Sequence, residues 1–207
     1  MTEGERVTEA EFETLLREVG ALKEGHFLLA SGRHSGQYIE KFDLLRQPRM
    51  TEQACREFVR QVQDWGVEVV AGPTTGGILL AFEVARQLGV AAAYAERASD
   101  GSSAREFRRG TQFPPGAKVL VVDDILTTGG SVRETLAALE REDVQVLGIA
   151  VLVDRSGGRV AFDVPLLALT RMDIATWEPD DCPLCRAGVP LVKPGTTASG
   201  GGAPKPA

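Results

Sequence analysis

Apolar and polar positions in the N-terminal part of the chain predict one helix followed by two strands. Thr8 and Glu11 have the spacing of a capping box, and apolar residues follow at helical intervals, at Phe12, Leu15, Leu16 and Val19. Two β-prone stretches, residues 26–30 and 38–45, flank the turn-rich segment Ser31–Gly36. We therefore expect an amphipathic helix and then a pair of strands joined by a polar loop.

From residue 51 onward, helical and strand patterns alternate. Helical periodicity covers residues 51–65, 78–88 and 131–141, and apolar strands cover 67–71, 91–95, 118–122 and 144–153, with one or two more strands over 160–170. Strands that are apolar throughout are typical of a sheet that is buried on both faces. The pattern predicts an α/β fold with a central, mainly parallel sheet flanked by helices.

Length and composition limit the classes of protein that fit. The chain has 207 residues, 43% of them hydrophobic, which suffices for one α/β domain over residues 1–193. Residues 194–207 are rich in Gly and Pro and predict a flexible tail. No long apolar segment or secretory signal is seen, so we expect a cytoplasmic protein without membrane contact.

Charge and cysteine content exclude two further classes. A formal net charge of −6 argues against nonspecific nucleic-acid binding, which needs a basic face. Three cysteines fit a reducing compartment better than a disulfide framework.

The strongest chemical signal is the segment VLVVDDILTTGGS, residues 119–131, which joins an apolar strand to a helical pattern. Two acids, Asp123 and Asp124, end the strand, and hydroxyls and free amides follow at the helix start, at Thr127, Thr128, Gly129, Gly130 and Ser131. A helix start binds phosphate, and paired carboxylates suit sugar hydroxyls or hydrated magnesium. The structural alternative is that the acids merely end a strand and the glycines form a turn.

Two more segments suit an anionic ligand. The loop Gly72–Gly77, with Thr74, Thr75 and Gly76, also joins a strand to a helix, although it could be an ordinary turn. The stretch Glu96–Gly110 concentrates positive charge at Arg97, Arg105, Arg108 and Arg109, although a solvated charge run would have the same composition.

Residues 119–131 resemble the phosphoribosyl pyrophosphate signature of the type I phosphoribosyltransferases. The resemblance implies that this fold is present, with Mg2+ bound through the substrate near Asp123 and Asp124. It further implies that both acids contact the ribose hydroxyls, that Ile125 and Leu126 belong to the binding segment, and that Thr127 to Ser131 wrap the 5′-phosphate. Residues 74–76 would form the pyrophosphate loop.

The same resemblance makes the basic stretch a mobile loop that closes over the pyrophosphate. Its arginines would stabilise the departing negative charge and exclude water. Arg97, with the two acids, is then a candidate catalytic residue, and Arg108 and Arg109 are candidate ligands, whereas Arg105 is a weaker one.

Other segments resemble orotate phosphoribosyltransferases in particular. The segment FLLASGR, residues 27–33, is similar to that family's N-terminal hood strand and turn. Tyr38 and Ile39 fall where the family stacks the pyrimidine, and Thr127 would also touch the base. Arg155 ends a strand where an arginine meets the carboxylate of orotate, a pairing that suits a planar guanidinium. Alternatively, Arg155 forms a surface ion pair with Asp154 or Asp173.

The sequence also departs from the better-known members. They carry lysines before the Ser-Gly-Arg turn and in the pyrophosphate loop, where this chain has Ala30 and Gly76, and lysines with a histidine in the mobile loop, where it has arginines. The roles of those lysines cannot be carried over, so the chain resembles a divergent branch.

A single CxxC, Cys182 to Cys185, is a weak metal signal because zinc sites need more ligands, and His26 and His34 are far away in sequence. A locally packed turn is the simplest interpretation. A symmetric dimer could supply a second CxxC.

The sequence thus predicts transfer of a phosphoribosyl group to orotate, with a purine phosphoribosyltransferase as the alternative. A non-catalytic regulator that binds phosphoribosyl pyrophosphate is a weaker one, because no nucleic-acid-binding module is seen. The resemblance implies a homodimer, with a hood from about residues 20–45 and 155–193 and a core from about 50–153.

Overall fold

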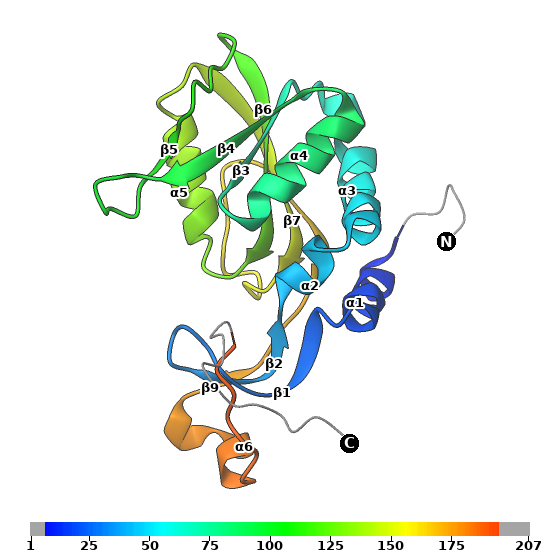
Figure 1. The fold of residues 1–207 in the computed structure, drawn as a ribbon, viewed down its shortest axis with the longest axis vertical. Helices are drawn as coiled ribbons and strands as arrows, with labels where there is room; N and C mark the ends of the chain where they lie inside the picture. The colour runs from blue at the N-terminus through cyan, green and yellow to red at the C-terminus, as the bar shows by residue number, and fades with distance from the viewer. Residues whose placement is uncertain (1–6, 195–207) are drawn as a thin grey trace, which may run out of the picture. The chain divides into compact units, whose positions relative to one another are not determined.

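The computed structural model describes residues 7–194 and divides the chain into two compact units (Figure 1). The larger unit comprises Met1–Leu22 and Glu40–Asp173, and the smaller one comprises Lys23–Ile39 and Ile174–Ala207. The smaller unit overlaps the expected hood, but residues 40–45 and 155–173 belong to the larger unit. The tail expected over 194–207 lies outside the described residues, apart from its first.

A six-stranded sheet in the order β5-β4-β3-β6-β7-β8 forms the centre of the larger unit. Its strands are β3 (Val69–Pro73), β4 (Ala91–Arg97), β5 (Arg105–Phe107), β6 (Ala117–Leu126), β7 (Val144–Asp154) and β8 (Leu166–Arg171). All neighbours are parallel except β4 and β5, which are antiparallel. The expected α/β fold with a mainly parallel sheet is confirmed.

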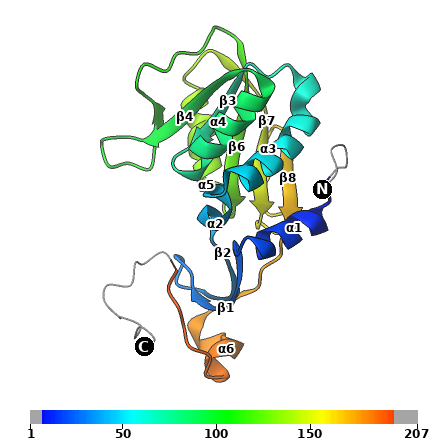
Figure 2. The ribbon, with the colours of Figure 1, turned by 45° about the vertical axis from the view of Figure 1, so that its right-hand side comes forward.

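Helices cover both faces of this sheet, as Figures 1 and 2 show. The β3-to-β4 crossover contains α4 (Gly76–Leu88), and the β6-to-β7 crossover contains α5 (Gly130–Leu139). The two crossovers move outward in opposite directions from the centre, so their right-handed connection places α4 and α5 on opposite faces. The remaining helices of this unit are α1 (Glu9–Glu18), α2 (Lys41–Leu45), α3 (Pro48–Val62) and η1 (Gln63–Trp65).

Burial follows the alternation of side chains along the central strands. Val119 and Val121 of β6 pack in the cluster that includes Val132 and Leu139 of α5. Leu120 and Val122 point to the other face and are equally buried. The continuous apolar run of β6 is therefore explained by a strand that is covered on both sides.

The smaller unit is a three-stranded sheet followed by short helical turns. The strands β1 (Leu22–Leu28), β2 (His34–Ile39) and β9 (Thr176–Trp177) lie in the order β1-β2-β9. After them come η2 (Pro179–Asp181) and α6 (Pro183–Arg186). The chain then returns to β1, where Val192 N donates to His26 O at 2.8 Å.

The N-terminal helix begins as expected. Thr8 Oγ1 accepts a hydrogen bond from Glu11 N, and Thr8 N donates to the Glu11 carboxylate at 2.8 Å, so the capping box is confirmed. Among residues 7–194, no helix is long and apolar enough to cross a membrane.

The expected strand over residues 38–45 is wrong beyond Ile39. Residues 41–45 form the helix α2, because the Glu40 side chain caps its start by accepting from Phe42 N, and the adjacent Leu44 and Leu45 are both buried. Two neighbouring buried residues do not fit a strand with one solvent face, but they fit one side of a helix.

The basic stretch is also more ordered than a loop. Arg105–Phe107 form β5, which pairs with the end of β4 as a hairpin.

Candidate active site

The site predicted from the sequence lies at the carboxyl ends of β3 and β6, which are adjacent and parallel. Val69 pairs with Val119 and Ala71 with Val121, so the loops that follow the two strands leave the same edge of the sheet. The chain moves outward in opposite directions from these strands, which is the topological switch point where α/β sheets bind ligands. The expected pyrophosphate loop and the expected phosphate loop are therefore neighbours.

The loop after β6 surrounds a small cavity at the start of α5. The cavity has a volume of about 60 Å3 and is lined by Asp123, Ile125, Leu126, Thr127, Thr128, Gly129, Gly130, Ser131 and Val132. Gly129 has φ of 79°, and a Cβ there would lie 2.9 Å from Val160 Cγ1, so this position needs glycine. The ten residues of α5 direct a helix N-terminus at the cavity, which favours an anion.

Asp123 lies within β6 and directs a largely buried carboxyl group to this cavity. Its Oδ1 accepts from Asp124 N at 2.8 Å, which leaves its other oxygen for a ligand. Burial, reinforced by the nearby charge of Asp124, raises the pKa of Asp123 to about 7. A carboxyl group that titrates near neutrality can accept hydrogen bonds from sugar hydroxyls once it is ionised.

Asp124 points to the opposite face of the strand, because neighbouring residues of a strand alternate. Its Oδ2 lies 2.7 Å from Lys41 Nζ of α2, and its Oδ1 accepts from Ile125 N at 2.8 Å. A Cβ at Gly76 would lie 1.9 Å from the same Oδ2, so only glycine permits this approach of the loop after β3. Asp124 thus joins β6 to the start of α4 and to Lys41.

The expected pyrophosphate loop, residues 72–77, is held by close backbone packing. The Thr74–Thr75 peptide bond is cis, and α4 begins directly after it at Gly76. A Cβ at Gly72 would lie 2.3 Å from Gly77 O, so the glycines at the two ends of the loop allow it to close tightly. Thr75 is exposed, while the Thr74 hydroxyl accepts from Arg105 Nη1 at 3.1 Å.

Arg105 is buried in the structure and serves to hold the elements around the loop. Besides Thr74, its guanidinium donates to Ala95 O at 3.0 Å and to Glu134 Oε2 at 3.1 Å. The side chain therefore connects β4, the loop after β3 and α5. This position explains why Arg105 is a poorer candidate for phosphate binding than its neighbours.

The other arginines of the hairpin lie nearer its surface. Arg109 makes a bidentate pair with Glu96, with both N···O distances at 3.1 Å, and Arg108 pairs with Glu106 at 2.9 Å. Arg97, exposed at the end of β4, makes no ion pair with any residue in the described part of the chain. The basic cluster is thus partly neutralised within its own hairpin.

The candidate orotate ligands are divided between the two units. In the larger unit, Arg155 follows β7, and its N–H donates to Leu126 O at 2.8 Å, one residue before the exposed Thr127. In the smaller unit, the half-buried ring of Tyr38 lies 5.7 Å from the Phe27 ring, and Ile39 is buried. Asp154, considered as a surface partner of Arg155, accepts from Ser156 N and lies 4.0 Å from Arg171 Nε.

Three charged residues at this site were not expected from the sequence. Lys41 lies in a segment whose pattern predicts a strand. Glu96 and Glu106, which pair with Arg109 and Arg108, lie in a stretch whose composition predicts an open loop. The adjacent leucines at 44 and 45, which break strand alternation, are the signal that could have revealed α2.

Comparison with known proteins agrees with this arrangement. The family model described as "Phosphoribosyl transferase domain" matches residues 44–180. The chain therefore belongs to the phosphoribosyltransferase family.

Curated relatives define the family more narrowly. The orotate phosphoribosyltransferase of Caldicellulosiruptor bescii is 43% identical over 182 residues, which cover 88% of this chain and 94% of that protein. That of Pelotomaculum thermopropionicum is 43% identical over 190 residues, covering 92% and 98%. Within the family, the chain is thus a member of the orotate phosphoribosyltransferases.

Solved structures share the fold. Orotate phosphoribosyltransferase from Aeropyrum pernix has a TM-score of 0.65 and 28% identity, covering 77% of this chain and 92% of that one. Adenine phosphoribosyltransferase from Saccharomyces cerevisiae has a TM-score of 0.63 at 19% identity, covering 77% and 99%, and this likeness concerns the fold alone.

Proposed function

We propose that the protein transfers the phosphoribosyl group of 5-phosphoribosyl 1-diphosphate to orotate, giving orotidine 5′-monophosphate and diphosphate. The observation that carries this proposal is the cavity at the start of α5, where Asp123 shares the lining with Thr127, Thr128 and Ser131. Family membership supports the same reaction, which belongs to pyrimidine biosynthesis.

The phosphate loop holds the 5′-phosphate in this proposal. Hydroxyls of Thr127, Thr128 and Ser131 and the free amides at the start of α5 donate hydrogen bonds to its oxygens. Ionised Asp123 accepts hydrogen bonds from a ribose hydroxyl and orients the sugar. Fixing both ends of the sugar orients C1′ for attack and reduces the entropic cost of the transition state.

The diphosphate lies at the second loop. The free amides at the start of α4, near Thr75 and Gly76, bind its oxygens, and the ammonium group of Lys41, already close to Asp124, adds positive charge. Better-known members of the family carry a lysine in this loop, where this chain has Gly76. We infer that Lys41 supplies the positive charge that Gly76 lacks. Arg97, Arg108 and Arg109 of the hairpin stabilise the negative charge that develops as the diphosphate leaves.

Magnesium is the proposed cofactor, bound with the diphosphate substrate. The donor set fits, because Asp123 has a carboxylate oxygen at the cavity and Mg2+ prefers such hard oxygen ligands. Asp124 is the poorer ligand, since it already pairs with Lys41. When bound, magnesium supplies positive charge to the leaving group.

The reaction itself needs no nucleophile from the protein. A ring nitrogen of orotate forms a bond to C1′ and gives up its proton to solvent or to the departing diphosphate. The bond from C1′ to the diphosphate oxygen breaks, so that its electron pair leaves with diphosphate. In the proposed complex, Arg155 and Thr127 bind orotate.

A substrate panel tests the proposal. Purified protein with Mg2+ and 5-phosphoribosyl 1-diphosphate should consume orotate, and should not turn over uracil, adenine, hypoxanthine or xanthine. Asp123→Ala should abolish turnover while the protein stays folded. Turnover of a purine without turnover of orotate would move the assignment to a purine phosphoribosyltransferase, and substrate binding without turnover of any base would support a regulator.

We further propose that the enzyme is a cytoplasmic homodimer. One face of α4 supports this, because Leu79 and Phe82, three residues apart, are 42% and 64% exposed. Large apolar side chains that are exposed together are typical of a surface that another chain covers.

A further inference from the structure

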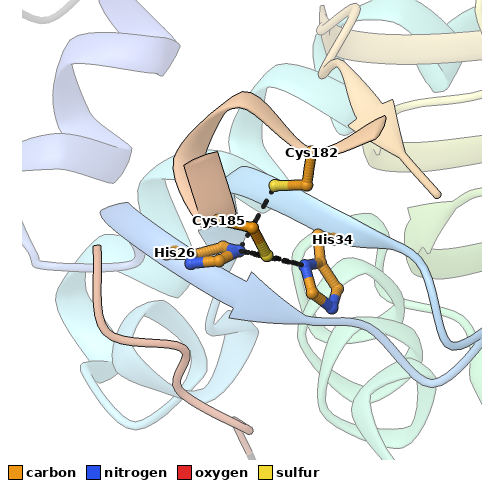
Figure 3. A group of neighbouring side chains, drawn as sticks. All are labelled: His26, His34, Cys182 and Cys185. Atoms are coloured by element: carbon orange, nitrogen blue, oxygen red, sulfur yellow. Dashed lines mark hydrogen bonds between the residues drawn. The ribbon is translucent and has the colours of Figure 1, made fainter. Parts of the chain in front are cut away.

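Two histidines and two cysteines meet in the smaller unit, although the cysteines are distant from the histidines in sequence. None of the four takes part in the proposed reaction. Figure 3 shows that His26 of β1, His34 of β2, Cys185 of α6 and Cys182, the residue before α6, point toward one another. One ligand atom from each residue lies within 4.8 Å of all the others. His26, His34 and Cys182 are buried, whereas Cys185 is exposed.

We propose that these four residues form a structural zinc site that holds the smaller unit together. The ligand atoms are His26 Nε2, His34 Nδ1 and the two sulfurs. This site is independent of the proposed transferase function, because none of its members takes part in substrate binding.

The distances between the ligand atoms fit a tetrahedral ion. With Zn–N near 2.0–2.1 Å and Zn–S near 2.3 Å, ligand atoms at tetrahedral corners lie about 3.3–3.8 Å apart. The two histidine nitrogens are 3.0 Å apart, and Cys182 Sγ is 3.4 Å from His26 Nε2. Cys185 Sγ is 3.7 Å from His26 Nε2 and 3.3 Å from His34 Nδ1. A small outward movement of the histidines is enough to admit the ion.

His26 is oriented as a metal ligand would be. Its Nδ1 lies 2.8 Å from Val189 O, and a carbonyl can only accept, so Nδ1 carries the proton. The lone pair of Nε2 then faces the two sulfurs. A backbone carbonyl on the far ring nitrogen is the usual support of a metal-bound histidine.

Zinc suits both the donors and their burial. Two thiolates with two neutral imidazoles form a common structural zinc set, whereas Mg2+ and Ca2+ require oxygen ligands. The two negative charges cancel the charge of Zn2+, so the buried site is neutral. A neutral site avoids the cost of an unpaired charge.

The smaller unit also needs such a stabiliser. The structure describes 38 residues of this unit, Lys23–Ile39 and 174–194. A fold of fewer than about 40 residues usually requires a metal, a disulfide or a partner. Its buried side chains include the polar His26, His34 and Ser35 beside Phe27. The four-residue cluster occupies the place of an apolar core and connects β1 and β2 to the turn at α6.

Metal analysis of the full-length protein, purified under reducing conditions without chelator, tests the proposal. Elemental analysis should find about one zinc ion per chain. Cys185→Ser and His34→Gln should each lose most of the zinc, whereas Cys55→Ala, which removes a cysteine of α3 outside the cluster, should retain it. Equal loss in Cys55→Ala would contradict the assignment, as would wild-type protein that contains no zinc and takes up none.

A second readout covers the case in which a variant fails to fold. Wild-type protein stripped of metal and titrated with Co2+ should develop the thiolate charge-transfer and tetrahedral ligand-field absorption of an S2N2 site, saturating at about one ion per chain. The proposal would be overturned if Cys182 and Cys185 formed a disulfide in protein purified under reducing conditions. Cobalt spectra without thiolate bands would also overturn it.

Discussion

Asp123 illustrates how one buried carboxyl group is placed for binding at a cost to stability. Its ordinary pKa of 3.8 is raised to about 7, first by burial and then by Asp124, so the fold favours the protonated form. The contribution of this preference to stability is fully present below pH 3.8 and is lost as the pH rises through about 7. Ligand binding needs the ionised form, which burial and the charge of Asp124 disfavour.

Replacement of Asp123 by asparagine should therefore stabilise the ligand-free protein at alkaline pH and abolish catalysis. Above pH 7 the free energy of unfolding of Asp123→Asn should exceed that of the wild type by about 1–4 kcal/mol, and the difference should vanish in acid. Denaturant titrations over a pH series measure it. A difference that does not change with pH would show that Asp123 does not titrate as described.

Lys41 of α2 forms an ion pair with Asp124, and removal of its charge should weaken substrate binding. In Lys41→Met, Asp124 loses its cation and the diphosphate loses a positive charge, so the KM for 5-phosphoribosyl 1-diphosphate should rise about ten- to a hundredfold, a loss of roughly 1.4–2.7 kcal/mol. Steady-state kinetics measure the effect. Lys118→Met, at the opposite end of β6, is the matched control and should leave KM unchanged.

The hairpin of β4 and β5 is the element in which charge pairing opposes the proposed function. Arg109 must leave Glu96 before it can reach an anion, and its hydrogen bonds lower the pKa of Glu96 below the ordinary value, so the pair persists in mildly acidic solution. This exposed pair is weak, so the exchange costs little.

Glu96→Gln should release Arg109 and lower the KM for 5-phosphoribosyl 1-diphosphate about two- to fivefold at low salt, with a smaller effect at high salt. Glu142→Gln makes the same charge change on an exposed residue outside the hairpin and serves as control. If both variants change KM equally, the effect comes from net charge and the pair plays no specific part.

The sequence is most informative for elements whose contacts are local. Residues 119–131 form strand, loop and helix in unbroken succession, and the structure brings Asp123 and Thr127 to one cavity as expected. The helix α2 is harder to predict, because its five residues are too few to show a helical repeat of apolar positions. Its start is capped by the Glu40 side chain, and glutamate is not a typical capping residue.

At the scale of the whole molecule, long-range contacts are what the sequence conceals. His26 and Cys182 are 156 residues apart, and Arg105 reaches Thr74 across 31, so neither pairing leaves a pattern in a local window. The same is true of Lys41 and Asp124. The fold class could therefore be predicted from the alternation of elements, whereas the ion pairs that Lys41, Glu96 and Glu106 make around the site could not.

The proposed dimer makes a prediction at this scale. Light scattering should give a mass twice the 22.2 kDa of the chain, and Phe82→Asp should shift the protein toward monomer, because a charge would be buried in the interface. Leu191→Asp, at an exposed apolar residue of the smaller unit, should leave the mass unchanged. A monomeric wild type would exclude the homodimer.

The contact between Gly76 and Asp124 has a consequence for how this branch can diverge. Any side chain at position 76 would displace the Asp124 carboxylate that Lys41 holds. We therefore expect a lysine at position 76 and a lysine at position 41 to exclude each other as sources of positive charge at this loop. Gly76→Lys alone should be deleterious, and the exchange requires change at both positions. We therefore expect the effects of substitutions at the two positions to be non-additive, and a sequence in this branch to carry one lysine or the other.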